Sequence, residues 1–303
     1  TQAKTLFPYT TLFRSHRLLQ AGYQVIGHDQ NLTSYASLIG YKNFETAAHL
    51  PLVSRYARVI FIFVPAGSAV DSVINGLKRE SQSGDIFVDG GNSFFKDSIA
   101  RAQQLKKDAI YFIDCGTSGG IHGQKEGFCL MIGGELEAYT NVRPLLSSIA
   151  TPNGYAHVGP SGAGHYVKMV HNGIEYALLQ AYAEGFALLH EQETYPQIDL
   201  MQIANLWNNG SVIRSWLLKL LQDGFAQEGQ DLRNVGGAVA QGGTGLWTLQ
   251  EAQAQKVSMP ALKVALEVRA LSRQTGGDYT TAFIAILRNQ FGGHAFEKKE
   301  GKK

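Results

Sequence analysis

A stripe of polar and titratable side chains runs along the segment 164–176, which reads GHYVKMVHNGIEY. Its polar members recur at the spacings that place side chains on one face of an α-helix. Apolar residues fill the positions between them, so the helix is predicted to be largely buried and its polar groups need partners. This pattern indicates a functional site rather than a solvated polar face. The stripe consists of Lys168, His171, Asn172, Glu175 and Tyr176.

The chain before this helix alternates between apolar runs of strand length and segments with helical periodicity. Such an alternation is typical of a parallel sheet covered by helices on both faces. We therefore expect an α/β fold with a doubly wound, Rossmann-like parallel sheet. The predicted strands are 23–28, 58–64, 85–89, 109–114, 128–132 and 155–158, and the predicted helices are 68–81, 98–107 and 135–148.

After Gly164 the strand signals disappear and only helical periodicity remains. The sequence therefore predicts a dinucleotide-binding domain over residues 16–160 and an all-helical substrate and dimerisation domain over residues 161–303. The helices expected in the second domain are 165–191, 200–207, 213–221, 246–256, 260–272 and 280–291.

Residues 1–15 do not fit this pattern. They mix apolar residues and threonines without a clear period and run abruptly into a helix end at 16–21, so we expect them to be non-native. A Rossmann-like sheet begins with a strand and a GxGxxG turn that places a pyrophosphate on a helix N-terminus. Both are missing here. The sequence therefore predicts weak cofactor binding and little turnover by the chain as it stands.

Asp29 follows the predicted strand 23–28. An acidic residue at this point of a nucleotide-binding sheet binds the adenosine ribose hydroxyls and repels a 2′-phosphate, which favours NAD while leaving NADP possible. The alternative is a solvated aspartate in a turn. Small residues after the next two strands would let a ligand approach the backbone. These candidate cofactor contacts are Val64, Pro65 and Ala66, and Gly90, Gly91 and Asn92.

Four segments together resemble the decarboxylating 6-phosphogluconate dehydrogenases. KMVHNGIEY, beginning at Lys168, resembles the catalytic helix of that family, and GTSGGIHGQKEGFCLMIGG at 116–134 resembles its substrate loop. GTGLWT at 243–248 resembles its phosphate-side motif, and RNQFGGH at 288–294 resembles its C-terminal arginine and histidine pair. The resemblance runs from about residue 16 to residue 296, and the short helical domain is similar to that of the short, NAD-preferring class.

The resemblance implies a reaction of the pentose phosphate pathway that needs no metal. In it, 6-phospho-D-gluconate is oxidised at C3, loses CO2 and gives D-ribulose 5-phosphate through an enediol. By matched position, Lys168 takes the C3 hydroxyl proton, which requires a neutral amine, and burial lowers the pKa of a lysine. Glu175 protonates the enediol, and His171 and Asn172 orient the substrate.

The resemblance also assigns substrate contacts. Ser118, Gly119 and Gly120 match the loop that holds the carboxylate and hydroxyls, and Asn92 bridges cofactor and substrate. In long members of the family, the C-terminal segment arrives from a neighbouring subunit. Long members also carry lysines where this chain has Gly242 and Leu246, so phosphate binding relies more on arginines. The matched phosphate ligands are Tyr176, Thr244, Arg269 and Arg288, with His294 completing the site.

Two other interpretations stay open. A β-hydroxyacid dehydrogenase shares the architecture, the SGG loop and the lysine, but would not decarboxylate a sugar phosphate; Glu175 with Arg269, Arg288 and His294 weighs against it. A non-catalytic, truncated homologue would gain little thermal stability from NAD, whereas an enzyme would gain clearly.

The composition of the chain limits the classes of partner that the protein can bind. The net charge of +2 comes from 27 basic and 25 acidic residues spread along the chain, which leaves no face for nucleic acid. No apolar run has the length of about 18 to 20 residues that a membrane helix needs. Cys115 and Cys129 offer neither a disulfide framework nor metal-ligand spacing, which favours the cytoplasm. We expect 6-phosphogluconate as the small-molecule partner, and we expect the chain to form a homodimer or homotetramer.

Overall fold

The computed structural model describes residues 8–299, without the side chains of residues 8–13 and 32. The segment 1–15, expected to be non-native, therefore lies partly outside the described residues. The chain divides into two compact units, Thr1–Met169 and Val170–Lys303. The boundary falls inside one continuous helix, α7 (Ala163–Glu191), which contributes residues to both units.

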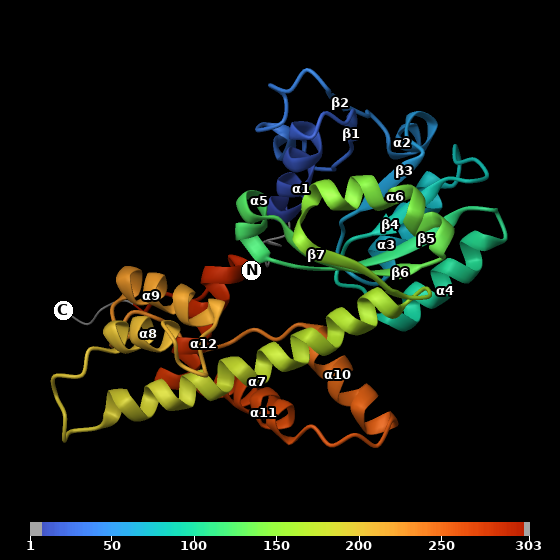
Figure 1. Cartoon of the computed structure of the whole chain (residues 1–303). Helices are drawn as coiled ribbons and strands as arrows, with labels where there is room; N and C mark the ends of the chain where they lie inside the picture. Colours follow the sequence, from blue (N-terminus) through green and yellow to red (C-terminus); the bar gives the residue numbers. More distant parts are fainter. Residues whose placement is uncertain (1–7, 300–303) are drawn as a thin grey trace. The chain divides into compact units, whose positions relative to one another are not determined.

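Unit 1 is built around a five-stranded sheet with the order β3-β4-β5-β6-β7 (Figure 1). The strands are β3 (Val59–Ile62), β4 (Ile86–Asp89), β5 (Tyr111–Ser118), β6 (Phe128–Gly134) and β7 (Ala150–Gly159). The helices are α1 (Pro8–Gln20), α2 (Leu50–Tyr56), α3 (Ser68–Leu77), α4 (Phe95–Lys106), α5 (Gly123–Glu126) and α6 (Leu136–Ile149), with 3-10 turns η1 (Leu32–Tyr35) and η2 (Gly120–His122).

The sheet is mostly parallel, as the alternation of strands and helices predicted. β3, β4 and β5 run parallel, and so do β6 and β7. The expectation was wrong for one pair, because β6 is antiparallel to β5. Residues 119–127 connect these two strands, and so short a segment cannot make the crossover of a dozen or more residues that a parallel pair requires.

Alternate side chains of the strands bury into two cores. Ile86 and Val88 of β4 face a cluster that includes Val142 of α6, whereas Phe87 faces Ile74 of α3 and Leu105 of α4. Figure 1 shows α6 on one side of the sheet and α3 and α4 on the other. Successive strand residues point to opposite faces of the sheet, so each continuous apolar run in the sequence supplies side chains to both cores.

The predicted strand 23–28 is shorter than expected and does not join the main sheet. It forms β1 (Val25–Gly27), which pairs only with β2 (Phe44–Thr46) in a separate two-stranded parallel sheet. Val25 nevertheless packs against the α6-side core and Ile26 against the α3-side core. No described strand lies between β1 and β3, which agrees with the predicted absence of the first strand.

The beginning of α7 is anchored to the sheet by a buried carboxylate. The backbone N–H groups of Gly162 and His165 donate to the two carboxylate oxygens of Asp114, at 2.6 and 2.9 Å. At Gly164 a β-carbon would overlap the carbonyl oxygens of Asp114 and Met131. The helix therefore packs directly on the backbones of β5 and β6.

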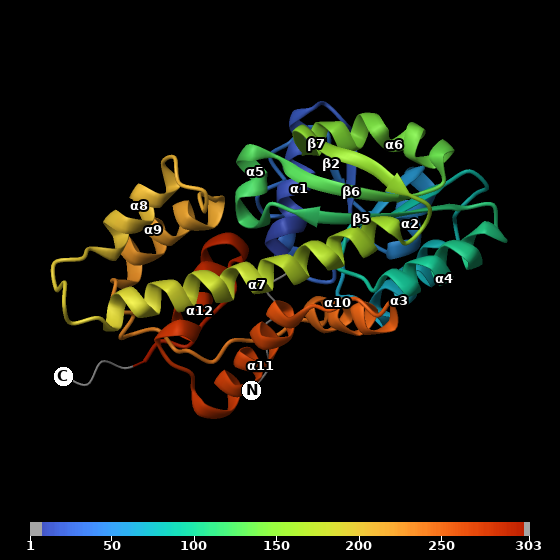
Figure 2. The ribbon, with the colours of Figure 1, turned by 60° about the horizontal axis from the view of Figure 1, so that its bottom comes forward.

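Unit 2 is helical, as predicted (Figure 2). The rings of Phe186, Phe225 and Phe283 contact one another in tilted and edge-to-face arrangements in the core of this unit. Two predicted starts were wrong by three residues. The helix expected from residue 246 begins at Gly243, and the helix expected from residue 213 begins at Trp216, where the Ser215 hydroxyl accepts from a backbone N–H of the first turn. None of the described helices is both long and apolar enough to span a membrane. The remaining helices are α8 (Leu200–Asn208), α9 (Trp216–Glu228), α10 (Gly243–Ala254), α11 (Pro260–Thr275) and α12 (Tyr279–Gly292).

Because α7 contacts the sheet backbone at Gly164, one added methyl group there should lower the free energy of unfolding strongly. Gly164→Ala should destabilise unit 1 by about 2 to 3 kcal/mol, because the carbonyl oxygens it meets belong to the sheet backbone and cannot rotate away. Thermal denaturation measures this. Gly185→Ala is the matched control, since that glycine lies in the same helix with open space around its Cβ position. Equal midpoints for the two variants would contradict the proposed contact.

Candidate active site

Three turns of unit 1 follow the carboxyl ends of neighbouring parallel strands. β3, β4 and β5 are parallel neighbours, so their carboxyl ends lie side by side. The turn after β3 carries Val64, Pro65 and Ala66, and Asn92 lies in the turn after β4. A β-carbon at Gly91 would lie 3.1 Å from the carbonyl oxygen of Val64, so the first two turns nearly touch. Ser118 ends β5, and Gly119 and Gly120 follow it with positive φ angles of 126° and 53°.

A buried arginine ties the first two of these turns together. Arg101 of α4 donates from Nε to Asp71 at 2.7 Å and from Nη2 to the carbonyl of Gly67 at 3.0 Å. Its Nη1 lies 3.7 Å from Asp89 at the end of β4, and Asp89 in turn accepts from the Ser93 hydroxyl at 2.7 Å. No pattern in the sequence predicted this network. Its only sequence signal is an aspartate that ends a buried strand.

Lys168 is buried in unit 1. Only 7% of its surface is exposed, and a β-carbon at Gly116 of β5 would overlap its stem. The lysine therefore packs against β5 two residues before Ser118. One turn earlier in α7, the Nδ1 atom of His165 lies 2.7 Å from the hydroxyl of Ser98. This contact joins α7 to α4.

The next residues of the polar stripe lie in unit 2 and meet α10. The Asn172 amide donates to the Thr244 hydroxyl at 3.2 Å, and its carbonyl oxygen lies 3.0 Å from Nδ1 of His171. A β-carbon at Gly245 would lie 2.9 Å from the ring of Tyr176. These close approaches bring together KMVHNGIEY and GTGLWT, which the sequence linked only by resemblance.

Arg269 of α11 is the most buried cation in the described part of unit 2, with 1% of its surface exposed. Its guanidinium carbon stacks 3.5 Å from the centre of the Tyr176 ring, but Nε and Nη2 have no hydrogen-bond partner among the described residues. Burial lowers the pKa of Arg269 to about 10; Tyr176 and Glu175 oppose the shift, and Arg288 adds to it. Buried donors without partners are costly, so this group is suited to an anionic ligand.

Arg288 and His294 belong to the same cluster. Burial lowers the pKa of Arg288, while Tyr176 and Glu175 oppose that shift. Burial also lowers the pKa of His294 to about 4, and the charges of Arg288 and Arg269 add to the effect. At neutral pH the histidine is therefore an uncharged donor beside two cations, an arrangement that can bind a phosphate dianion. We call Tyr176, Arg269, Arg288 and His294 the anion cluster.

The nucleotide residues are only partly assembled. Asp29 lies two positions after β1, and its carboxylate accepts from the backbone N–H of Asn31 at 2.8 Å. No GxGxxG turn precedes it in the described chain. Instead, α1 runs as one helix from Pro8, and the buried Arg14 guanidinium lies over Phe63 at 4.4 Å. The turns after β3 and β4 approach one another closely enough to fit a dinucleotide, whereas the usual pyrophosphate turn is absent from residues 8–24.

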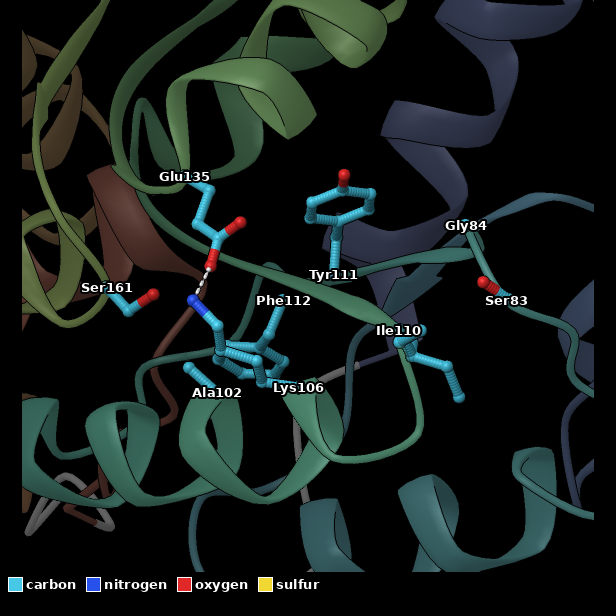
Figure 3. A pocket seen from close by; sticks show the side chains of 10 residues that line it. Ser83, Gly84, Ala102, Lys106, Ile110, Tyr111, Phe112, Glu135 and Ser161 are labelled. Carbon is cyan, nitrogen blue, oxygen red and sulfur yellow. Dashed lines mark hydrogen bonds and ion pairs between the residues drawn. The ribbon is translucent and has the colours of Figure 1, made fainter.

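A hollow of about 250 Å³ lies at the opposite edge of the sheet, beside the start of β5 (Figure 3). Lys106 and Glu135 form an ion pair of 2.9 Å at this hollow, and their side chains are 75% and 47% exposed. Pairs so exposed contribute little binding energy. None of the predicted site residues lines it.

A mostly parallel sheet with candidate nucleotide contacts at its carboxyl edge, followed by a helical domain, is an architecture typical of dinucleotide-dependent dehydrogenases. The family model of the NAD-binding domain of 6-phosphogluconate dehydrogenase matches residues 15–159. The model of the C-terminal domain of 6-phosphogluconate dehydrogenase matches residues 164–281. The chain belongs to the 6-phosphogluconate dehydrogenase family.

Individual relatives agree with this assignment. The chain is 42% identical to an NAD(+)-dependent, decarboxylating 6-phosphogluconate dehydrogenase of Haloferax volcanii, over 94% of both chains. It is 37% identical to a putative 6-phosphogluconate dehydrogenase of Bacillus subtilis, over 93% of this chain and 94% of that one. Among solved structures, it is similar to the 6-phosphogluconate dehydrogenase of Plasmodium falciparum, with 25% identity and a TM-score of 0.79. That similarity covers 87% of this chain and 60% of the other.

The depressed pKa of His294 predicts a pH dependence of stability. The unfolded chain takes up this proton near pH 6.5, but the folded chain only near pH 4. The stabilising contribution is therefore fully present above pH 6.5 and is lost as the pH falls toward 4. We expect the thermal midpoint of His294→Gln to decline less over that range than the midpoint of the unmodified protein. Parallel curves for the two proteins would show that His294 titrates normally.

Proposed function

We propose that this protein oxidises 6-phospho-D-gluconate at C3, releases CO2 and produces D-ribulose 5-phosphate. The observation that carries the proposal is one helix, α7, which bears the buried Lys168 and, two turns later, Glu175 beside the anion cluster. The family of the chain and its similarity to a relative named as NAD-dependent and decarboxylating support the same reaction.

Lys168 is the proposed base of the first step. Its amine takes the proton of the C3 hydroxyl while the hydride leaves C3. NAD, when bound, accepts that hydride. The burial of Lys168 against Gly116, beside the strand that ends at Ser118, supports this role. The protonated amine then hydrogen-bonds to the new C3 keto oxygen and draws electrons from the C1–C2 bond as CO2 departs.

Glu175 is the proposed acid of the last step. Loss of CO2 leaves an enediol, and Glu175 delivers a proton to the carbon that carried the carboxylate. The neighbouring Arg269 and Arg288 balance the charge that Glu175 acquires when it releases the proton. Two titratable groups with opposite tasks on one helix face suit this sequence of steps.

The remaining roles divide between the two units. The turns of Val64–Ala66 and Asn92 are proposed to hold NAD, and Ser118, Gly119 and Gly120 to hold the carboxylate and hydroxyls of the substrate. His171, Asn172 and Thr244 orient the substrate, and the anion cluster binds its phosphate. The unpartnered guanidinium donors of Arg269 support this last role. The two free cysteines, Cys115 and Cys129, are consistent with a cytoplasmic protein, and we propose a homodimer or homotetramer.

The test of the activity is NAD reduction together with CO2 release from 6-phosphogluconate. Two proteins are compared: the chain as it stands, and a version in which a strand, a GxGxxG turn and a helical turn replace residues 1–15. We expect the second protein to bind NAD and turn over, and the first to be nearly inactive. Oxidation of a simple β-hydroxyacid without CO2 release would favour the rival dehydrogenase. Absence of NAD stabilisation in both proteins would favour a non-catalytic homologue.

Two substitutions separate the proposed acid and base. In the version with the replaced N-terminus, Lys168→Met should lower kcat on the order of 1,000-fold, with substrate binding largely retained, because only the base is lost. Glu175→Gln should slow a step after hydride transfer, so the first turnover remains fast. Lys263→Met, at a surface lysine whose side chain is 63% exposed, is the control. Equal loss of hydride transfer in both site variants would refute the division of roles.

Asp29 predicts the cofactor preference. We expect a higher kcat/KM with NAD than with NADP, because the carboxylate repels a 2′-phosphate. Asp29→Asn should narrow this preference by about tenfold, since it removes the charge but keeps the size. Steady-state kinetics with both cofactors measure the ratio. A tenfold preference of the unmodified site for NADP would refute the assignment.

A further inference from the structure

The first two turns of α4 contact the beginning of α7. The Ser98 hydroxyl lies 2.7 Å from Nδ1 of His165, and both side chains are buried, with 0% and 2% of their surfaces exposed. Beside this contact, the ring of Phe95 meets the ring of Tyr166 edge-on, with 5.1 Å between their centres. Figure 1 shows the beginning of α7 next to α4. α4 is therefore attached to the turn of α7 that immediately precedes Lys168.

A glycine allows the two helices to approach so closely. A β-carbon at Gly162 would lie 2.6 Å from Cγ1 of Ile99 and 3.1 Å from the carbonyl oxygen of Phe95. The N–H of the same Gly162 donates to the carboxylate of Asp114 on β5. The beginning of α7 is thus held by β5 and by α4 together.

On α4, Arg101 follows Ser98 by three residues, which is about 4.5 Å along the helix axis. The guanidinium of Arg101 binds the Asp71 carboxylate at 2.7 Å and the Gly67 carbonyl at 3.0 Å. Gly67 directly follows Val64–Ala66, the first turn proposed to hold NAD. One side chain of α4 thereby holds the end of that turn.

Arg101 reaches the second turn through Asp89. Its Nη1 lies 3.7 Å from the Asp89 carboxylate, which is fully buried. That carboxylate accepts from the backbone N–H of Gly91 at 3.1 Å and from the Ser93 hydroxyl at 2.7 Å. Gly91 and Ser93 are the two neighbours of Asn92. The carboxylate therefore holds the chain on both sides of the residue proposed to bridge cofactor and substrate.

We propose that α4 positions the NAD-binding turns and the proposed base Lys168 relative to each other. Arg101 sets the two turns, and Ser98 sets, through His165, the turn of α7 that precedes Lys168. These three are positioning residues, which touch neither substrate nor cofactor. A misplacement of reacting atoms by about 1 Å can slow a reaction on the order of 100-fold, so a rigid connection between the two groups affects the rate. The inference rests on the proposed function for the reaction, but not for the geometry.

Two substitutions of His165 test its link to Ser98. The amide of asparagine lies near the place of Nδ1 and can donate or accept, whereas the amide of glutamine lies near the place of Nε2. In the version with the replaced N-terminus, His165→Gln should lower the single-turnover rate of NADH formation at least about tenfold, whereas His165→Asn should stay within about threefold of the unmodified rate. The KM for 6-phosphogluconate should change less than about twofold in both variants. Equal losses of rate in both variants would overturn the proposal.

Arg101→Lys tests the hold on the NAD turns. Lysine keeps the charge, but one ammonium cannot replace the fork of a guanidinium that binds Asp71 and Gly67 together. We expect the KM for NAD to rise at least about tenfold, because the two turns are no longer fixed to each other. Arg143→Lys, at an exposed arginine of α6, is the control and should leave this KM unchanged. A lower thermal midpoint of Arg101→Lys with an unchanged KM for NAD would show a purely structural role and would refute the proposal.

Hydrogen exchange tests the connection through α4 without catalysis, in the chain as it stands. Ser98→Ala removes one end of the link, so amide exchange should accelerate at least about threefold in residues 162–168 and also in 64–67 and 89–93. Ser147→Ala removes an exposed hydroxyl of α6 that donates to a backbone carbonyl, and it should change none of these segments. Acceleration confined to residues 162–168 would overturn the connection. Failure of the unmodified protein to use 6-phosphogluconate would refute only the proposed function, since hydrogen exchange would still decide the role of α4.

Discussion

The buried carboxylate of Asp114 holds the helix on which the rest of the site depends. It accepts the backbone N–H groups of Gly162 and His165, which are among the unpaired donors that every helix N-terminus leaves. A negative charge at that end also interacts favourably with the helix dipole. The carboxylate is fully buried, so solvent does not screen this interaction. One residue in the middle of β5 thereby holds the first turn of α7.

The α7 backbone also approaches the backbones of β5 and β6 closely, and this fixes the position of its first residues. A β-carbon at Gly133 would lie 2.6 Å from both the Asp114 carboxylate and the N–H nitrogen of Gly164, and Gly116 leaves room for the stem of Lys168. With the helix seated directly on the strand backbones, Lys168 lies beside the strand that ends at Ser118. The part of the polar stripe that belongs to unit 1, Lys168, is thus positioned by the packing of the first turns of α7.

In contrast to the Asp114 anchor, where opposite partial charges attract, the anion cluster holds like charges close together. Two arginines, one of them stacked on Tyr176, lie next to a histidine that is kept neutral by burial and by their charges. Such an arrangement lowers the stability of the protein without its ligand, because buried cations repel one another and lack water. The short connection from α11 to α12 opposes that repulsion, and so do the backbone hydrogen bonds that join Glu297 to Gly236 and Lys299 to Asn234. Binding of a dianion would relieve it.

The sequence by itself determined the alternation of strands and helices, the all-helical second domain and the polar stripe from Lys168 to Tyr176, because each depends on local periodicity. It also indicated that the first strand of the sheet is missing. Among the described residues, the separate pairing of β1 with β2 agrees with this. Only the tertiary structure decided the antiparallel course of β6, the capping of α7 by Asp114 and the network around Arg101. It also decided that the Arg269 guanidinium stacks on the Tyr176 ring. These features depend on contacts between residues far apart in the sequence, and no local pattern encodes which buried charge will meet which backbone N–H group.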